Sequence, residues 1–404
     1  MPKPNLKTLS VIMLALLWSV PLLGQPSVLW QKSYGGDTEE DDEIGYAIAK
    51  TSDGGFVIAG QATDVKRDTT PGVWTRPEVK DRTWLVKTDS KGSVQWTKKL
   101  RGNEGYAVHQ TSDGGYVVIA RSASDEFYLI KTDSKGDTLW TKAFEAAAGR
   151  SVAMAPDGGI IAIGSKKLWH PSRRAVLYML KIDTAGNTLW EKEHVLGTDV
   201  KACCIRPTSD GGYVVTGKAH RPAPEYGQLF IVKTDANGDT LWARYFGVDD
   251  NEEGRCVIET SDGGYLAVGT TTSFGNTREF YAVKIDSKGD SLWAKHYGVQ
   301  HYAEILNGSV VATGDGKYLI IGSIDSSPNP QLYECGQVYI VKIDGTGKKL
   351  WSKYYGKKHS SESAYGVVKV SNGYVIVGSD YPNESSDGSR VRHDSDVYLL
   401  KISK

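Results

Sequence analysis

The stretch Ser112-Asp-Gly-Gly-Tyr-Val-Val-Ile-Ala120, followed by Lys131-Thr-Asp-Ser-Lys-Gly-Asp-Thr-Leu-Trp140, is one copy of a unit that recurs along the chain. The unit joins an Asp-Gly turn, an apolar run, a Lys-x-Asp element and a tryptophan nine positions after the lysine. An Asp-Gly pair between apolar runs is a strong hairpin signal, because glycine tolerates the positive φ of a tight turn. The unit therefore predicts short antiparallel strands.

This unit recurs seven times, at intervals of about 50 residues. The turns are Asp53-Gly54, Asp113-Gly114, Asp157-Gly158, Asp210-Gly211, Asp262-Gly263, Asp315-Gly316 and the variant Asn372-Gly373. The lysines are Lys87, Lys131, Lys181, Lys233, Lys284, Lys342 and Lys401, and the tryptophans are Trp30, Trp96, Trp140, Trp190, Trp242, Trp293 and Trp351. Each copy has room for four strands: A before the turn, B after it, C ending at Lys-x-Asp, and D with the tryptophan. Four-stranded units at this period indicate a β-propeller.

The two ends of the repeat region are complementary. Trp30 belongs to a D strand that has no A, B or C strand before it, and Lys401 ends a C strand that has no D strand after it. An N-terminal strand that completes the last blade removes two exposed sheet edges. We therefore predict an all-β fold, a single seven-bladed β-propeller of four-stranded antiparallel blades over residues 25–404. An open stack of blades would leave the complementary ends unexplained.

Residues 1–24 are typical of a secretory signal peptide. Lys3 and Lys7 precede an apolar run from Val11 to Leu23, and Gly24 is a small residue at a plausible cleavage point. The run is too short for an ordinary membrane span, and an uncleaved anchoring helix is the alternative. No other long apolar run is present. We expect a secreted or periplasmic protein with no membrane span in the mature chain.

Composition excludes some classes of function. The chain carries 48 basic and 48 acidic side chains in 404 residues, which argues against a nucleic-acid binder. Its four cysteines are too few for a disulfide scaffold. We expect a monomer whose partner is a glycan or a cell-envelope protein.

The repeat resembles a known group of proteins. Units such as Lys131-Thr-Asp-Ser-Lys-Gly-Asp-Thr-Leu-Trp140 are similar to those of secreted bacterial β-propeller repeat proteins, with a DGGYVVxG and VKTDxxGxxxW pattern. They also look like the quinoprotein-type repeat, in which the tryptophan packs between blades. The resemblance covers residues 26–404, and it implies blade structure rather than an activity.

Loop lengths distinguish the two faces of the predicted ring. The A–B and C–D turns are short and uniform, whereas the distance from turn to lysine is 34 positions from Asp53 to Lys87 but 18 from Asp113 to Lys131. Variable loops on a repeated scaffold usually carry binding, so we assign function to the face with the B–C and D–A loops.

Aromatic and basic residues gather in the B–C loops. Rings that stack on sugars beside cations that pair with carboxylate or sulfate suit an acidic glycan. The candidate ligand-binding residues are Trp74, Arg76, Trp169, His170, Arg173, His220, Arg221 and Tyr226. Solvated loops whose charges only confer solubility are the alternative.

The D–A loops Asp37–Glu43 and Asp249–Glu253 are acidic. They could bind Ca²⁺ through carboxylate oxygens, but they lack EF-hand spacing, so exposed charge is the preferred interpretation. We expect no metal site and no cofactor.

Strand A should line the central channel. The residues seven positions before each turn are Tyr46, Tyr106, Arg150, Cys203, Arg255, Gly308 and Tyr365, and His109 and Arg206 lie three residues further along their strands. Tyr46, Tyr106, His109, Arg150, Arg255 and Tyr365 are the candidate catalytic residues for a lyase acting on an acidic glycan. Arginine would neutralise the carboxylate, and tyrosine or histidine would move the proton. Packing aromatics in a water-filled channel are the alternative.

Three functions therefore remain. The leading hypothesis is a non-catalytic binding scaffold that holds a glycan or a protein on its variable face. A polysaccharide lyase is the second. A quinone-dependent dehydrogenase is the third, and its only support beyond the repeat is the adjacent pair Cys203-Cys204. Free buried thiols are expected at Cys204 and Cys256, with a disulfide between them as the alternative.

Overall fold

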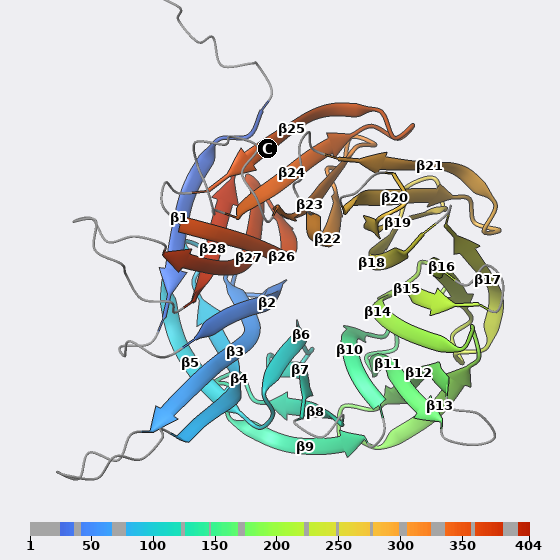
Figure 1. The fold of residues 1–404 in the computed structure, drawn as a ribbon. Helices are drawn as coiled ribbons and strands as arrows, with labels where there is room; N and C mark the ends of the chain where they lie inside the picture. Colours follow the sequence, from blue (N-terminus) through green and yellow to red (C-terminus); the bar gives the residue numbers. More distant parts are fainter. Residues whose placement is uncertain are drawn as a thin grey trace, which may run out of the picture.

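The computed structural model describes residues 25–35, 42–66, 78–122, 126–144, 147–168, 174–221, 226–247, 250–274, 278–298, 305–324, 336–356, 360–382 and 395–404. In these ranges the chain forms strands and turns and no helix, with 28 strands in seven four-stranded antiparallel sheets. The sheets surround a central channel as the blades of a seven-bladed β-propeller (Figure 1). The predicted fold class is confirmed. No helix within these ranges is long and apolar enough to cross a membrane.

The first three blades follow one another along the chain. Blade 1 is β2 (Glu43–Lys50), β3 (Phe56–Lys66), β4 (Glu78–Thr88) and β5 (Val94–Leu100); blade 2 is β6 (Glu104–Gln110), β7 (Tyr116–Arg121), β8 (Phe127–Thr132) and β9 (Thr138–Phe144); blade 3 is β10 (Ala147–Met154), β11 (Ile160–Leu168), β12 (Arg174–Ile182) and β13 (Thr188–His194). The first strand of each blade is innermost and the fourth is outermost (Figure 1).

The remaining blades keep this order, except that the last one borrows its outer strand. Blade 4 is β14 (Asp199–Pro207), β15 (Tyr213–His220), β16 (Gly227–Thr234) and β17 (Thr240–Phe246); blade 5 is β18 (Glu252–Glu259), β19 (Tyr265–Thr271), β20 (Glu279–Ile285) and β21 (Ser291–Tyr297); blade 6 is β22 (Ile305–Ala312), β23 (Tyr318–Ile324), β24 (Gln337–Ile343) and β25 (Lys349–Tyr355). Blade 7 is β26 (Ser360–Val370), β27 (Gly373–Pro382), β28 (Asp396–Ile402) and β1 (Val28–Tyr34).

The ring closes through β1. Trp30 lies opposite Lys401 and Gln31 opposite Leu400 in the antiparallel pair of β1 and β28. The backbone N–H of Ser403 donates to the carbonyl of Ser27 at 2.9 Å, which extends the pairing by one step. The blue β1 lies beside the red β28 in Figure 1. The predicted closure by the N-terminal strand is confirmed.

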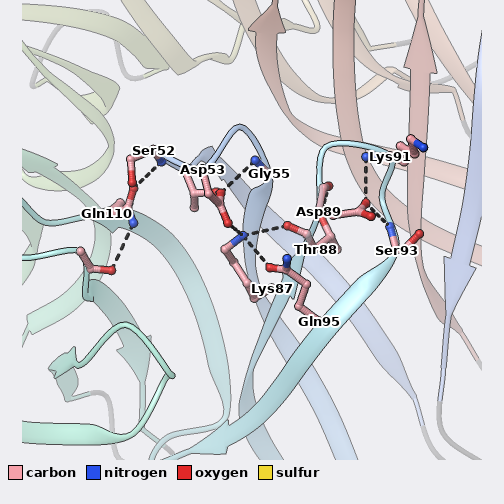
Figure 2. Close-up of polar contacts among 12 residues, drawn as sticks. Ser52, Asp53, Gly55, Lys87, Thr88, Asp89, Lys91, Ser93, Gln95 and Gln110 are labelled. Atoms are coloured by element: carbon pink, nitrogen blue, oxygen red, sulfur yellow. Dashed lines mark hydrogen bonds and ion pairs between the residues drawn. The ribbon is translucent and has the colours of Figure 1, made fainter.

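The Lys-x-Asp element joins strand C to the A–B turn. In blade 1 the buried Nζ of Lys87 contacts Asp53 at 2.8 Å, the Thr88 carbonyl at 2.8 Å and the Gln95 amide oxygen at 3.0 Å (Figure 2). Four further blades repeat the ion pair, as Lys131–Asp113, Lys181–Asp157, Lys233–Asp210 and Lys284–Asp262. Blade 6 differs, because Asp315 pairs with Lys317. In blade 7 Asn372 replaces the aspartate.

The tryptophan of strand D packs on the next blade. A Cβ on Gly136, in the C–D turn of blade 2, would lie 2.6 Å from the ring of Trp96, so only glycine allows this contact. Trp96 also meets Tyr116 edge to face, with ring centroids 5.7 Å apart. Lys98, two residues after the tryptophan, reaches Asp137 of the same turn at 2.6 Å. The tryptophan and lysine of the repeat therefore dock neighbouring blades.

Candidate binding site at the mouth of the central channel

Every inner strand carries a β-bulge at its N-terminal end. In blade 1 the register of β2 with β3 shifts between Gly45 and Ala47, so Tyr46 has no partner on β3. The equivalent shifts in the other blades leave out Tyr106, Arg150, Cys203, Arg255, the pair Asn307 and Gly308, and Tyr365. A bulge leaves its extra residue outside the ladder and redirects the side chain. The residues seven positions before the turns are thus the bulged residues, a feature that regular alternation did not reveal.

Glycine on strand B makes room for the bulge. Gly269 lies opposite Gly254, and a Cβ on Gly269 would lie 1.7 Å from the carbonyl oxygen of Glu253. Gly60 and Gly378 face the same restriction, at 1.8 Å and 1.6 Å from the Ile44 and Ser363 carbonyls. This explains the glycine that follows the apolar run in most copies of the repeat. The bulge is therefore encoded on the strand opposite to the one that bears it.

The bulged residues surround a cavity of about 280 Å³ at the channel mouth. Its lining consists of Tyr46, Tyr106, Arg150, Lys201, Cys203, Arg255, Gly308 and Tyr365. The bulges lie at the ends of the inner strands that follow the D–A connections, away from the Asp-Gly turns. The mouth therefore opens on the face with the variable loops.

One half of the mouth is aromatic. The ring of Tyr46 lies 5.5 Å from that of Tyr106 and 5.3 Å from that of Tyr365, between centroids. Tyr46 donates its hydroxyl hydrogen to Gln61 at 3.3 Å, and Tyr106 donates to Glu104. Blades 7, 1 and 2 thus supply three adjacent rings with hydroxyl groups in reach of a polar ligand.

The other half of the mouth is cationic. The guanidinium of Arg150 lies over the ring of Tyr106, 4.4 Å from its centroid. Arg255 and Lys201 share one carboxylate, that of Glu253, at 3.3 Å and 2.7 Å. Of the carboxylates near the mouth, Glu253 pairs with two of these three cations and Glu104 pairs with Arg121 at 3.3 Å. The lining cations are therefore in excess, and an anionic group of a ligand would be attracted.

Electrostatics at the mouth favours binding over proton transfer. Burial raises the pKa of Tyr46, Tyr106 and Tyr365, and Glu104 adds to the rise at the first two, so the hydroxyls are proton donors at neutral pH. Burial opposes ionisation of Glu253, but Arg255 and Lys201 hold the pKa of its carboxyl below the usual range.

A second cavity of about 150 Å³ includes the same bulged residues and reaches deeper into the channel. His109, Arg206 and Ser151 are among the residues that line it. Burial, with the charge of Arg206, lowers the pKa of His109 to about 4, so the imidazole is neutral at physiological pH. His109 does not line the mouth cavity, and no other histidine does within the described ranges.

The structure brings the channel candidates together, and it describes three of the eight loop candidates. Trp74, Arg76, Trp169, His170 and Arg173 lie outside the described residues. The other three do not line either cavity: His220 is the last residue of β15 rather than a loop residue, Arg221 lies over the Tyr245 ring at 4.6 Å, and Tyr226 is 47% exposed.

Sequence reasoning missed Lys201 and Glu253, although a signal was present. Each lies two residues before a bulged residue, Cys203 or Arg255, so strand alternation places it on the same side of the strand. Glu104 has the same relation to Tyr106.

The interpretation of the acidic D–A segments needs a correction. Residues 36–41 and 248–249 lie outside the described ranges. Glu43 and Glu252, which we expected as exposed charge, are buried in β2 and β18, and Glu252 accepts hydrogen bonds from the hydroxyls of Thr271 and Ser273. Across the part of the chain that is described, no group of three or more His, Cys, Asp or Glu side chains is placed to hold a metal ion.

Comparisons with known proteins support the fold and little more. No protein-family model matches the chain. The regulatory protein FlaEY of Caulobacter vibrioides is 23% identical over 211 residues, which is 46% of this chain and 22% of that protein, so the chain spans about a fifth of the curated relative's length. A protein of unknown function from Dyadobacter fermentans superposes with a TM-score of 0.53 at 12% identity, over 94% of this chain and 99% of that one. BBS1N, solved in complex with ARL6DN, superposes with a TM-score of 0.51 at 9% identity, over 94% and 96%.

Proposed function

We propose that the chain is a secreted or periplasmic binding scaffold that captures an acidic glycan at the channel mouth. The observation that carries the proposal is the mouth itself, where Arg150, Arg255 and Lys201 line the cavity beside three tyrosine rings and outnumber the nearby carboxylates of Glu253 and Glu104. Arginine pairs with a carboxylate or sulfate in a two-pronged geometry, and a tyrosine ring stacks on a sugar face. The two halves of the mouth match the two halves of such a sugar unit.

The size of the cavity limits what enters it. About 280 Å³ is at the low end of small-molecule pockets, so one charged sugar unit would fill it. The rest of a polymer would lie over the variable loops, where the aromatic and basic residues of the sequence analysis remain candidates. A protein that presents an acidic side chain is the competing ligand.

A lyase is less well supported by the same geometry. Proton abstraction needs a base beside the sugar, but the raised pKa values of the mouth tyrosines make them poor bases. His109 is a neutral imidazole, yet it lines only the deeper cavity. The dehydrogenase hypothesis is also less well supported, because Cys203 lines the mouth whereas Cys204 lies in the core with Cys256.

The test is calorimetric titration of the full chain with polygalacturonate, with neutral dextran as the reference. We expect binding of polygalacturonate alone, weakened by added salt because the contact is ionic. Arg150→Gln should weaken binding about tenfold, the effect of losing one hydrogen bond to a charged group. Lys135→Gln, which removes one charge from the C–D turn on the opposite face, is the matched control and should bind as the unmodified chain does.

Three outcomes would reject the proposal or redirect it. Equal binding of dextran and polygalacturonate, or none of either, contradicts an anionic glycan site. Ultraviolet absorbance from unsaturated products during the titration would favour the lyase. If Arg221→Gln weakens binding and Arg150→Gln does not, the ligand lies on the loops outside the channel.

A further inference from the structure

Two thiols occupy equivalent places in neighbouring blades. The residue after each bulge is small throughout the ring, namely Ala47, Ala107, Ser151, Cys204, Cys256, Ser309 and Gly366. Cys204 on β14 and Cys256 on β18 are adjacent members of this ring, and both are free cysteines, as the sequence favoured. They are buried in one core cluster, and both line the deeper cavity. The two sulfur atoms are therefore neighbours across the interface of blades 4 and 5.

The surroundings of the two sulfurs are unequal. Around Cys256 lie the Cys204 thiol, the Ser309 hydroxyl, the backbone N–H of Val310 and the positive charge of Arg206, each of which favours the thiolate form. The Cys204 thiol is the largest of these influences, and together they hold the pKa of Cys256 below the usual thiol range although burial opposes this. A thiolate is the nucleophilic form of cysteine, so Cys256 is the more reactive of the pair.

The channel offers a route to the pair for a small reagent. Both cysteines line the deeper cavity, which includes the bulged residues of the open mouth. A space of about 150 Å³ admits a molecule of roughly the size of water but no folded protein. The oxidant that reaches these sulfurs must therefore be small, and a protein disulfide oxidoreductase is excluded by size.

We propose that Cys204 and Cys256 form a peroxide-sensitive dithiol that closes to a disulfide between blades 4 and 5. The Cys256 thiolate attacks the O–O bond of hydrogen peroxide, which forms a sulfenic acid and, after protonation of the leaving hydroxide, one water. The Cys204 sulfur then attacks the sulfenic sulfur, the S–S bond forms, and a second water leaves. Overall two thiols are oxidised by two electrons and one peroxide is reduced to two waters.

The bond would act directly on the mouth. Cys203 and Arg255, which line the mouth cavity, immediately precede the two cysteines in β14 and β18. A covalent link one residue below them would restrict how far the two bulges can separate. This consequence rests on the proposed function, whereas formation of the disulfide does not.

The experiment treats the reduced full chain with hydrogen peroxide, unfolds it in iodoacetamide and maps cysteines by mass spectrometry. We expect one cross-linked peptide pair joining Cys204 to Cys256, and both cysteines alkylated in the untreated sample. Cys203→Ser is the matched control and should give the same cross-link, because the Cys203 side chain faces the mouth, where burial raises its pKa to about 11. Alkylation of both cysteines after treatment, or a cross-link through Cys203 or Cys335, would overturn the proposal.

A second pair of variants tests the order of events without relying on the disulfide. In Cys204→Ser the hydroxyl still places a donor beside Cys256 but cannot resolve the sulfenic acid, so dimedone should trap it at Cys256. In Cys256→Ala the remaining Cys204 should be labelled about tenfold less, since its thiolate lacks the same donors. Equal labelling would contradict the assigned roles. Unchanged tryptophan fluorescence of each variant checks that the ring is intact.

Glycan titration separates this inference from the proposed function. If the cross-link forms and polygalacturonate never binds, the dithiol stands and the proposed function fails. If polygalacturonate binds and no cross-link forms, the proposed function stands and the dithiol proposal fails.

Discussion

The two ends of each inner strand follow opposite rules. At the end that carries the Asp-Gly turn, five blades repeat the same buried lysine, the same aspartate and the same turn. At the bulged end the backbone is equally regular, but the side chains differ from blade to blade. The residues at the turn repeat because each hairpin is held by the same lysine–aspartate pair and the same tight turn. Variation at the bulge creates one asymmetric site from a ring of similar positions.

This contrast separates scaffold residues from the residues that we propose bind a ligand. A ligand is asymmetric, so a site for it cannot use the same side chain seven times. Blade 2 shows both rules within a few residues. Tyr106 recurs at its position only in blades 1 and 7, and His109 in no other blade. The Thr111 hydroxyl, in contrast, donates to Asp113 as the equivalent threonines of blades 1, 4 and 5 do to their turn aspartates. The predictions below test whether the two ends are independent.

The largest effect is expected from crowding a bulge. Gly269→Ala places a Cβ 1.7 Å from the Glu253 carbonyl, and the strand must move, so the free energy of unfolding should fall by about 3 kcal/mol. Gly263→Ala in the turn of the same blade places a Cβ with no atom within 4 Å. Its only cost is the strain of an alanine at a φ of +79°, so the free energy of unfolding should fall by about 1 kcal/mol. Urea denaturation followed by tryptophan fluorescence measures both. Equal losses would mean that the strand accommodates a Cβ at this position, as blade 2 does, where Ala120 stands opposite the same bulge.

A smaller effect is expected from removing a buried lysine at the turn end. The Lys131 side chain is 1% exposed and its partner Asp113 is 54% exposed, so much of the pair is screened by solvent. Lys131→Met should lower the free energy of unfolding by about 2 kcal/mol, less than for a fully buried pair. The same change at Lys401, where Asn372 replaces the aspartate, should cost less than about 1 kcal/mol. The comparison fails if both variants lose the same stability in urea.

Gly308 is the bulged residue without a side chain, so a substitution there can add a group to the mouth. Such a change can strengthen ligand binding as well as weaken it. A Cβ on Gly308 would make only an ordinary contact, at 3.4 Å from Gly269. Gly308→Lys should strengthen binding of polygalacturonate about threefold and Gly308→Glu should weaken it about threefold, as one partly screened charge would. Calorimetric titration at two salt concentrations measures both. Changes of the same sign in the two variants would show that bulk rather than charge governs the mouth.

The smallest expected effect is the loss of folding stability when the pH is lowered. Burial alone would raise the pKa of Asp262, but hydrogen bonds from Thr260, Lys284 and the Gly264 N–H outweigh it and lower the pKa to about 2. A depressed pKa stabilises the fold fully above the ordinary aspartate range near about pH 4, and that contribution is lost as the pH falls toward about 2.

The matching variant isolates this contribution. Asp262→Asn should lower stability by a few tenths of a kcal/mol at pH 7, because the carboxylate is more than half exposed. The gap between the variant and the unmodified chain in urea midpoints should shrink as the pH is lowered from 4 to about 2. A gap that is constant across this range would contradict a role for the ionised carboxylate. The mouth should not respond, since it lies at the other end of the strand.

Much of the turn end could be predicted from sequence, and much of the bulge end could not. Trp96 and Lys131 belong to a repeated pattern, so their local contacts follow from spacing and from the hairpins that they close. Gly308 and Lys201 lie at positions that differ in residue type from blade to blade, so the repeat does not indicate what they do. The bulge at Tyr46 depends on the register of Gly45 with Gly60 on a different strand, and strand alternation alone cannot place it.

By itself the sequence determined the number of blades, the strand order, the closing strand and the face that can vary. These properties follow from local periodicity and from complementary ends, which need no knowledge of distant contacts. Only the tertiary structure decided that seven bulges bring their Tyr, Arg, Cys and Gly residues to the lining of one cavity, and that Cys204 meets Cys256. The reason is that register between strands and contact between blades arise from packing of segments about 50 residues apart, and no local pattern specifies that geometry.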